Sequence, residues 1–223
     1  MTQLPPLSLL ETRVLGVLVE KEHTVPDTYP LSLNALTLGC NQKNNRQPVI
    51  DAREADVQAV VDGLRARSLV IETSGARVTR YSHNVGRVLR IPGQSVALLA
   101  VLMLRGPQTA AELRTSTERM HKFADVSSVE AFLDELAARP PEAGGPLVFK
   151  LARAPGERES RWAQLLAGPV EVRRAEPGVP DAPVDLSVAD LAALRAQHNA
   201  LVEEVADLRA KMQRMASELG ITL

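Results

Sequence analysis

Aromatic residues are scarce in this sequence: they make up 3% of its 223 residues. Hydrophobic residues nevertheless reach 45%, so leucine, valine and alanine must fill the interior, and this favours close-packed helices over a β-sandwich. Cysteine is almost absent, since Cys40 is the only one. A single cysteine excludes an internal disulfide and predicts a reducing, cytoplasmic location.

Long hydrophobic runs are also missing. No stretch approaches the roughly 20 apolar residues that a membrane helix needs. Residues 1–10 lack the basic start and the apolar run of a signal peptide. We therefore expect neither membrane insertion nor secretion.

The chain has no excess of charge of one sign: 26 Lys and Arg stand against 27 Asp and Glu. The net charge is +2 over residues 1–91 (11 basic, 9 acidic), zero over 92–168 (9 and 9) and −3 over 169–223 (6 and 9). A dedicated DNA-binding domain usually carries a larger positive excess than +2. The charge therefore counts against a simple DNA-binding assignment.

Signatures of catalysis and of metal binding are lacking too. The chain has no phosphate-binding glycine loop and neither a G-x-S-x-G nor an H-E-x-x-H sequence. The four histidines are scattered without ligand spacing, and no motif links Cys40 to a histidine base. The sequence thus predicts no enzyme, no catalytic residue, no metal and no cofactor, and no small-molecule ligand is evident.

A helix-entry signal, by contrast, is repeated along the chain. Four candidate capping boxes pair Ser8 with Glu11, Asp51 with Glu54, Thr109 with Glu112 and Ser127 with Glu130. In such a box the first side chain accepts a bond from a free N–H of the first turn, and the glutamate reaches back to the cap. Apolar residues of helical period follow the boxes. Residues 31–40 predict a further, shorter helix.

Strand signals occur in two places, at residues 69–71 with 78–81 and at 147–151 with 161–165. The expected order is three helices followed by a β-hairpin, and it occurs twice along the chain. This order is the winged-helix arrangement. We predict a mainly α fold with small β-hairpins (α+β). Its predicted parts are two tandem winged-helix domains at 1–91 and 92–168, a flexible Pro/Gly linker at 169–185 and a coiled-coil helix at 186–220.

The C-terminal segment carries a heptad pattern over four heptads. The predicted a and d contacts are Leu191, Leu194, His198, Leu201, Val205, Leu208, Met212 and Met215. The polar His198 at an a position would fix the register at some cost in stability. A narrow apolar stripe behind a linker favours a homodimer or a helical protein partner, and the alternative is a helix that folds back on its own domain.

Several motifs resemble the YceH family of bacterial proteins. The resemblance is carried by Tyr29-Pro-Leu-Ser-Leu-Asn34, Cys40-Asn-Gln-Lys-Asn-Asn-Arg46, Val78-Thr-Arg-Tyr81, Leu104-Arg-Gly-Pro-Gln-Thr109 and Pro155-Gly-Glu-Arg-Glu-Ser-Arg161. It covers roughly residues 9–166. The resemblance implies two winged-helix domains, and it implies no activity, ligand or catalytic residue.

The loop at residues 41–46 and the third helix of the first domain are the first candidates for DNA contact. The loop holds Lys43, Asn44, Asn45 and Arg46, which could bond bases, phosphates or a partner's backbone. Alternatively, its asparagines cap the preceding helix and close turns. On the helix, Gln58 and Arg65 are the candidate base readers, although the acidic Glu54 and Asp62 beside them would repel phosphate.

The tips of the two hairpins are the second candidates. They carry Arg77, Arg80, Arg153, Arg158 and Arg161, and arginines on a hairpin tip suit phosphate or minor-groove contact. Alternatively, Glu157 and Glu159 pair with the arginines of the second hairpin.

Two functions remain open. The first is a dimeric DNA-binding protein, such as a transcriptional regulator, and fold analogy favours it. The second is a protein-interaction adaptor, which the weak charge excess and the acidic third helices favour. DNA binding would require the polar loop and both hairpins to form one continuous positive face, whereas separated basic spots would favour the adaptor.

Overall fold

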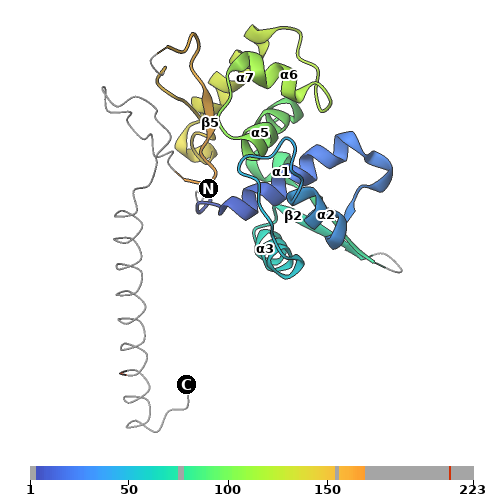
Figure 1. The fold of residues 1–223 in the computed structure, drawn as a ribbon. Coiled ribbons are helices and arrows are strands. Elements are labelled where there is room, and N and C mark those ends of the chain that lie inside the picture. Colours follow the sequence, from blue (N-terminus) through green and yellow to red (C-terminus); the bar gives the residue numbers. More distant parts are fainter. Residues whose placement is uncertain (1–3, 75–77, 154–155, 169–210, 212–223) are drawn as a thin grey trace, which may run out of the picture. The chain divides into compact units, whose positions relative to one another are not determined.

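The computed structural model describes residues 4–74, 78–153, 156–168 and 211 (Figure 1). These residues form a mixed α+β fold with seven α-helices and two small antiparallel sheets. The predicted linker, all eight predicted coil contacts and Arg77 lie outside the described residues. Among the residues described, no helix is long and apolar enough to cross a membrane.

The first half of the fold runs from α1 to β3. Its elements are α1 (Leu9–Thr24), a 3₁₀ turn η1 (Pro26–Thr28), β1 (Leu31–Ser32), α2 (Leu33–Cys40), α3 (Glu54–Ala66), β2 (Val70–Ser74) and β3 (Thr79–His83). The strands form an antiparallel sheet in the order β1-β3-β2. The predicted hairpin is confirmed, and β1 joins it through the pairing of Leu31 with Tyr81. The prediction that residues 31–40 are entirely helical was wrong at its start, because Ser32 caps α2 by accepting a bond from the Ala35 N–H.

The second half begins after a short helix that the sequence did not predict, α4 (Val85–Leu89). Its remaining elements are α5 (Gly93–Arg105), α6 (Ala110–Thr117), α7 (Val126–Ala137), a 3₁₀ turn η2 (Pro141–Ala143), β4 (Val148–Lys150) and β5 (Trp162–Gln164). β4 and β5 pair antiparallel, so the second predicted hairpin is confirmed as well. Each half thus presents three helices followed by a hairpin.

Two of the four predicted capping boxes are confirmed. Ser8 and Glu11 exchange both bonds at the start of α1, and Thr109 and Glu112 do so at the start of α6. Each box satisfies an orphan donor of the first helical turn while fixing where the helix begins.

The other two boxes were wrong by a few residues. α3 follows Arg53, which makes no side-chain cap bond, instead of beginning after Asp51. α7 is capped by Asp125 in place of Ser127, and the Asp125 carboxylate accepts the Ser128 N–H at 2.7 Å. A second cap-forming residue two positions upstream took the role that the sequence pattern gave to Ser127.

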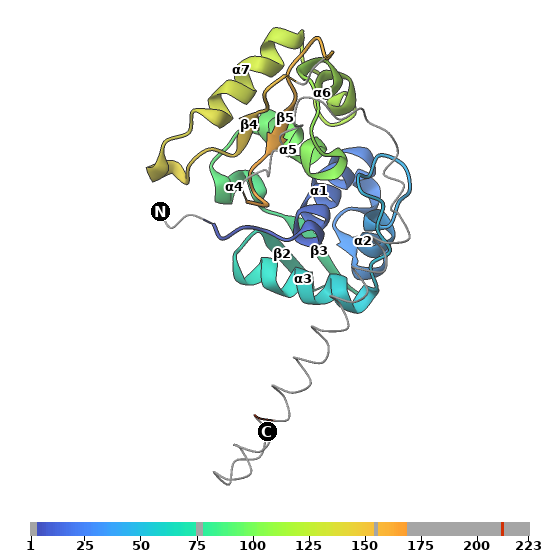
Figure 2. The same cartoon turned by 60° about the vertical axis from the view of Figure 1, so that its left-hand side comes forward.

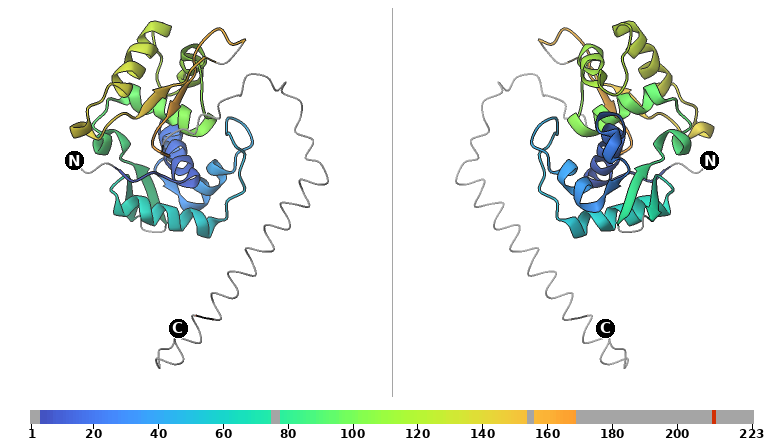
Figure 3. Two further views of the ribbon diagram at one scale, coloured as in Figure 1. Left: turned by 90° about the vertical axis from the view of Figure 1, so that its left-hand side faces the viewer. Right: turned by 90° about the vertical axis from the view of Figure 1, so that its right-hand side faces the viewer.

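The two halves share one hydrophobic core, in which α1 lies against α5. α3 lies at one end of this unit and α7 at the opposite end, with α1 and α5 between them, as the three cartoons agree (Figures 1, 2 and 3). The close approach depends on Gly16, since a Cβ there would stand 2.8 Å from Cγ of Leu104. The fold therefore fixes how its two third helices are placed relative to each other.

Candidate functional site

The loop between α2 and α3 is organised from the inside by Arg46, whose side chain is 0% exposed. All five of its N–H groups have acceptors. Nε bonds the Gly39 carbonyl at 3.1 Å, and Nη1 bonds the Asn45 carbonyl at 2.9 Å and Glu20 Oε1 at 3.2 Å. Nη2 bonds Glu20 Oε2 at 2.6 Å and Gln42 Oε1 at 2.9 Å. Since every donor is satisfied, Arg46 holds the loop to both α1 and α2.

The partner carboxylate of Glu20 is charged in this arrangement. Burial by itself would raise the pKa of Glu20, but the hydrogen bond and the positive charge of Arg46, together with Lys21, outweigh burial and lower it. The Glu20–Arg46 pair is thus a charged pair that links α1 to a loop 26 residues further along the chain.

A second buried arginine supports the loop and pairs with no carboxylate of the described residues. Arg13 on α1 is 0% exposed and donates from Nη1 to the Cys40 carbonyl at 3.0 Å and from Nη2 to the Pro48 carbonyl at 2.6 Å. Burial, and next the charge of Arg46, lower the pKa of Arg13. Burial raises the pKa of Cys40 to about 12, so its thiol stays protonated, as expected for a residue buried at a helix end.

Two further contacts close the loop. The Asn41 amide bonds the backbone of Ala52 in both directions, each bond at 2.8 Å. The Gln47 N–H donates to the Leu104 carbonyl at the end of α5, at 2.8 Å. The loop is therefore anchored to α1, α2 and α5 and also closed on itself.

The outward side of the same loop is polar and exposed. Lys43, Asn44 and Asn45 all face solvent, and Asn45 adopts a left-handed backbone with φ of 60°, which asparagine tolerates better than most residues. No acidic residue occurs between positions 41 and 50. The structure thus divides the loop: Asn41 and Arg46 build it, and Lys43 to Asn45 are available for contact.

Arg46 was predicted to lie on the contact surface, and this prediction was wrong because the structure buries its side chain. An enclosed guanidinium whose five donors are already bonded cannot reach a phosphate or a base. Sequence reasoning missed two other side chains that support the loop, Glu20 and Arg13. A signal did exist for Arg13, because it lies four residues before Val17 and so shares the buried face of α1.

The two candidate base readers on α3 are both engaged by neighbours. Gln58 donates to Asp62 at 3.0 Å and accepts the Tyr81 hydroxyl at 3.3 Å. Arg65 lies 3.1 Å from Asp62 and 2.7 Å from Glu72. The positive charge of Arg65 is therefore neutralised locally on a helix that also exposes Glu54.

The arginines of the hairpins fall into two groups. Arg161 pairs with Glu112 at 2.8 Å and with Glu157 at 3.1 Å, which is the pairing that the alternative interpretation expected for Glu157. Arg80 is exposed, and its Nη1 donates to the carbonyls of Thr28 and Pro30. Arg153 and Arg158 are exposed and form no hydrogen bond or ion pair with another described residue.

These basic groups do not gather in one place. The β2–β3 hairpin lies at the α3 end of the unit, whereas β4 and β5 lie at the α7 end (Figures 1 and 2). Among the described residues no cluster of His, Cys, Asp and Glu could hold a metal ion. The site with the best-defined architecture is therefore the α2–α3 loop.

Comparison with known proteins extends the resemblance beyond residue 166. The chain is 62% identical over 218 residues to a UPF0502 protein of Methylibium petroleiphilum, covering 97% of this chain and 91% of the relative. It is 61% identical over 216 residues to a UPF0502 protein of Paraburkholderia phytofirmans, covering 96% and 90%. A UPF0502 protein of Leptothrix cholodnii is 57% identical over 219 residues, with 97% of each chain covered.

Alignments that leave only 3–4% of the chain uncovered must run into the heptad-patterned segment, which the resemblance noted from motifs did not include. The expected link to a bacterial family is confirmed, while the YceH name stays an expectation. A family match spans residues 7–157 and so covers the first half and the second half as far as β4, while β5 lies beyond it. The chain belongs to the family described as "Protein of unknown function, DUF480".

Proposed function

We propose that each half is a winged-helix unit and that the chain is a cytoplasmic, non-enzymatic protein. In this proposal it binds DNA through the first half and acts in transcriptional regulation. The observation that carries this proposal is the α2–α3 loop, which two buried arginines hold in one shape while Lys43, Asn44 and Asn45 face outward. In a helix-turn-helix this connection leads into the helix that enters the major groove.

The chemistry of the exposed loop suits nucleic acid. Asparagine amides offer a donor and an acceptor together, as base edges require, and Lys43 adds a cation for phosphate. A loop that is already ordered loses little conformational entropy on binding. These properties support recognition by Lys43 to Asn45, with Arg80 as a further cation from β3 of the same half.

The second half is a poor candidate for groove contact. Its third helix, α7, exposes Glu130, Asp134 and Glu135, and carboxylates at these positions would repel phosphate. Arg161 is bonded to two acids. We therefore assign the second half a supporting role, with α5 holding the loop through the bond from Gln47 to Leu104.

A protein-interaction adaptor is the second candidate, and two observations favour it. The basic side chains form separate spots instead of the one positive face that DNA contact by the loop and both hairpins together would require (Figures 1 and 2). This counts against DNA contact by the whole chain, and the DNA proposal is therefore confined to the loop and β3 of the first half. Beside the polar loop, Leu38 on α2 is 64% exposed and Val49 is 55% exposed, which fits a partially apolar protein contact better than a phosphate backbone.

DNA binding by the full chain across a salt series distinguishes the two candidates. Under the DNA proposal, the protein raises the fluorescence anisotropy of a labelled short duplex, and the affinity obtained from this signal falls as salt increases. Lys43→Ala reduces the steepness of log affinity against log salt by about one. Asn44→Ala changes the preference among sequences. The matched control is Arg153→Ala with Arg158→Ala, which removes two exposed cations of the second half and leaves binding unchanged.

Absence of binding at low salt, where phosphate contacts are strongest, would contradict the DNA proposal. A protein partner would then be expected to lose affinity with Leu38→Ser and Val49→Ser. These two changes test the adaptor, because they alter only exposed apolar side chains at the loop.

We further propose that the heptad segment pairs two chains. The pattern of leucines at d supports this, as does the alignment of relatives through the segment. Sedimentation of the full chain would give a dimer mass that falls to the monomer mass with Leu194→Glu and Leu201→Glu. A monomer mass for the unchanged chain would contradict it.

A further inference from the structure

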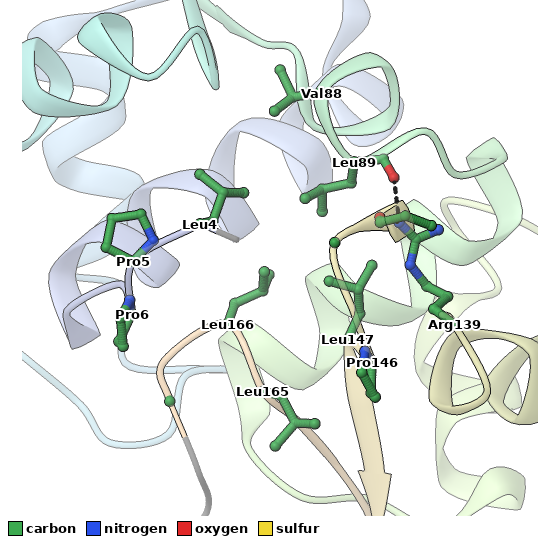
Figure 4. Close-up of a pocket in the computed structure, with 13 residues that line it drawn as sticks. Leu4, Pro5, Pro6, Val88, Leu89, Arg139, Pro146, Leu147, Leu165 and Leu166 are labelled. Carbon is green, nitrogen blue, oxygen red and sulfur yellow. Dashed lines mark hydrogen bonds between the residues drawn. The ribbon is translucent and has the colours of Figure 1, made fainter. Parts of the chain in front are cut away.

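A cavity of about 680 Å³ lies between the second half of the fold and the two segments that flank the first half, namely the residues before α1 and helix α4. Its walls come from the residues before α1, from α4, from the connection between α7 and β4, and from the residues after β5 (Figure 4). The volume falls within the roughly 300–1,000 Å³ of small-molecule sites, which prefer interfaces between folding units. No residue of the α2–α3 loop lines it.

The walls of this cavity are tied together by hydrogen bonds. The Leu7 N–H donates to the Leu166 carbonyl at 2.7 Å, and the Leu165 N–H donates to the Leu147 carbonyl at 2.9 Å. Arg139 joins two walls by donating from Nη2 to the Leu89 carbonyl at 2.8 Å (Figure 4). The cavity is therefore framed by contacts that exist without any ligand.

The lining is suited to hydrocarbon. Leucines from all four walls line it, among them Leu4, Leu89, Leu147 and Leu166 (Figure 4). Three of the lining residues are prolines, including Pro6 and Pro146, and proline has no N–H to offer. A strongly polar ligand would find few donors here and would lose its hydration.

One charged group stands at the edge of the cavity. Arg139 uses Nε for the Gly145 carbonyl and Nη2 for the carbonyls of Leu89 and Ala143. Its Nη1 bonds none of the described residues and is not among their buried unpartnered atoms. A guanidinium with a donor to spare beside apolar walls is complementary to a carboxylate attached to a hydrocarbon body.

We propose that this cavity binds a small amphipathic carboxylate, such as a medium-chain fatty acid. The hydrocarbon lies against the leucines and prolines, and the acid group meets Arg139. No small-molecule ligand was evident from the sequence, because the lining residues come from four separate segments that only the fold brings together. The inference does not depend on DNA binding.

Calorimetric titration of the full chain with decanoate tests the proposal. Saturable one-to-one binding is expected. Val88→Phe, which puts a larger side chain into the lining, should weaken it at least tenfold. The matched control Val78→Phe makes the same change at an exposed position outside the lining and should leave the affinity unchanged. Equal binding by the two variants, or none by the unchanged chain, would overturn the proposal.

Two further measurements test the proposal without the Val88→Phe variant, in case that variant folds poorly. In the unchanged chain, decanoate should shift the methyl NMR signals of Leu89, Leu147 and Leu166, and shifts confined to other methyl groups would overturn the site. Decylamine should bind at least tenfold more weakly than decanoate, since it replaces the acid by a cation next to Arg139. Equal affinity for the two would overturn the assignment of an acidic head group.

Discussion

Arg46 and Glu20 form a two-bond ion pair, Nη1 to Oε1 at 3.2 Å and Nη2 to Oε2 at 2.6 Å, in which the arginine side chain is 0% exposed and the glutamate side chain 17%. The pair connects the exposed α2–α3 loop to the central helix α1. Because the same guanidinium also bonds Gly39, Gln42 and the Asn45 carbonyl, the shape of the loop depends on this one charge.

Glu20→Gln should destabilise the fold by roughly 2–3 kcal/mol. Removing one partner of a buried pair leaves the other charge uncompensated, at a cost of about 3–5 kcal/mol when both are fully buried, and the partial exposure of Glu20 reduces this cost. Urea denaturation would measure it. The control is Asp56→Asn, which breaks the exposed pair with Arg53 and should change the midpoint little. Equal effects of the two substitutions would contradict a special role for Glu20.

The same pair should make stability depend on pH in the acid range. The pKa of Glu20 is lower in the folded protein than in the unfolded chain, so the unfolded state binds the proton first. The stabilisation is fully present above the usual glutamate pKa of about 4.3 and is lost as the pH falls through the lowered folded value. The free energies of unfolding of the unchanged chain and of Glu20→Gln should therefore converge as the pH is lowered from neutral to 3. A constant gap between them would refute the linkage.

Cys40 should be inert toward thiol reagents in the folded protein. Burial raises its pKa to about 12, so at pH 8 almost none of it is the reactive thiolate, and the side chain is fully enclosed. A chromogenic disulfide should react with no thiol in native buffer and with one per chain in denaturant, because the sequence has one cysteine. Rapid reaction in native buffer would show that α2 opens frequently.

The order of helices and hairpins could be predicted because apolar periodicity and capping boxes are local properties of the chain. β1 could not, since two residues are too few to show alternation. Arg46 could not be placed either: within a run of six polar residues it looks like a solvent-exposed cation. Its burial is decided by Glu20, which lies 26 positions earlier and comes close only once α1 and α2 have packed.

The cavity beside Leu89 could not be predicted from the sequence either. Each of its walls is unremarkable in sequence, and nothing local relates Pro6 to Leu147 or Leu166. For the hairpin arginines, by contrast, the sequence predicted both alternatives, namely exposed cations or ion pairs with nearby glutamates. The structure assigns Arg161 to ion pairs with Glu112 and Glu157, while Arg153 and Arg158 keep their predicted exposure.

Gly16→Ala should destabilise the contact between the two halves. An added Cβ would lie 2.8 and 2.9 Å from two side-chain carbons of Leu104, and Leu104 is itself only 2% exposed, so it has no free space to move into. Overpacking of this kind costs typically about 1–3 kcal/mol. Thermal unfolding of the full chain would detect it as a lower midpoint.

Gly63→Ala is the matched change on α3, where a Cβ would meet nothing within 4 Å. Alanine is favoured over glycine inside a helix, so this variant should gain about 0.4–1 kcal/mol. The opposite signs of the two substitutions separate the steric cost at the α1–α5 contact from the general preference of helices for alanine. If Gly16→Ala were as stabilising as Gly63→Ala, α1 and α5 could not be as close as the structure places them, and the coupling of the α2–α3 loop to the second half would lose its basis.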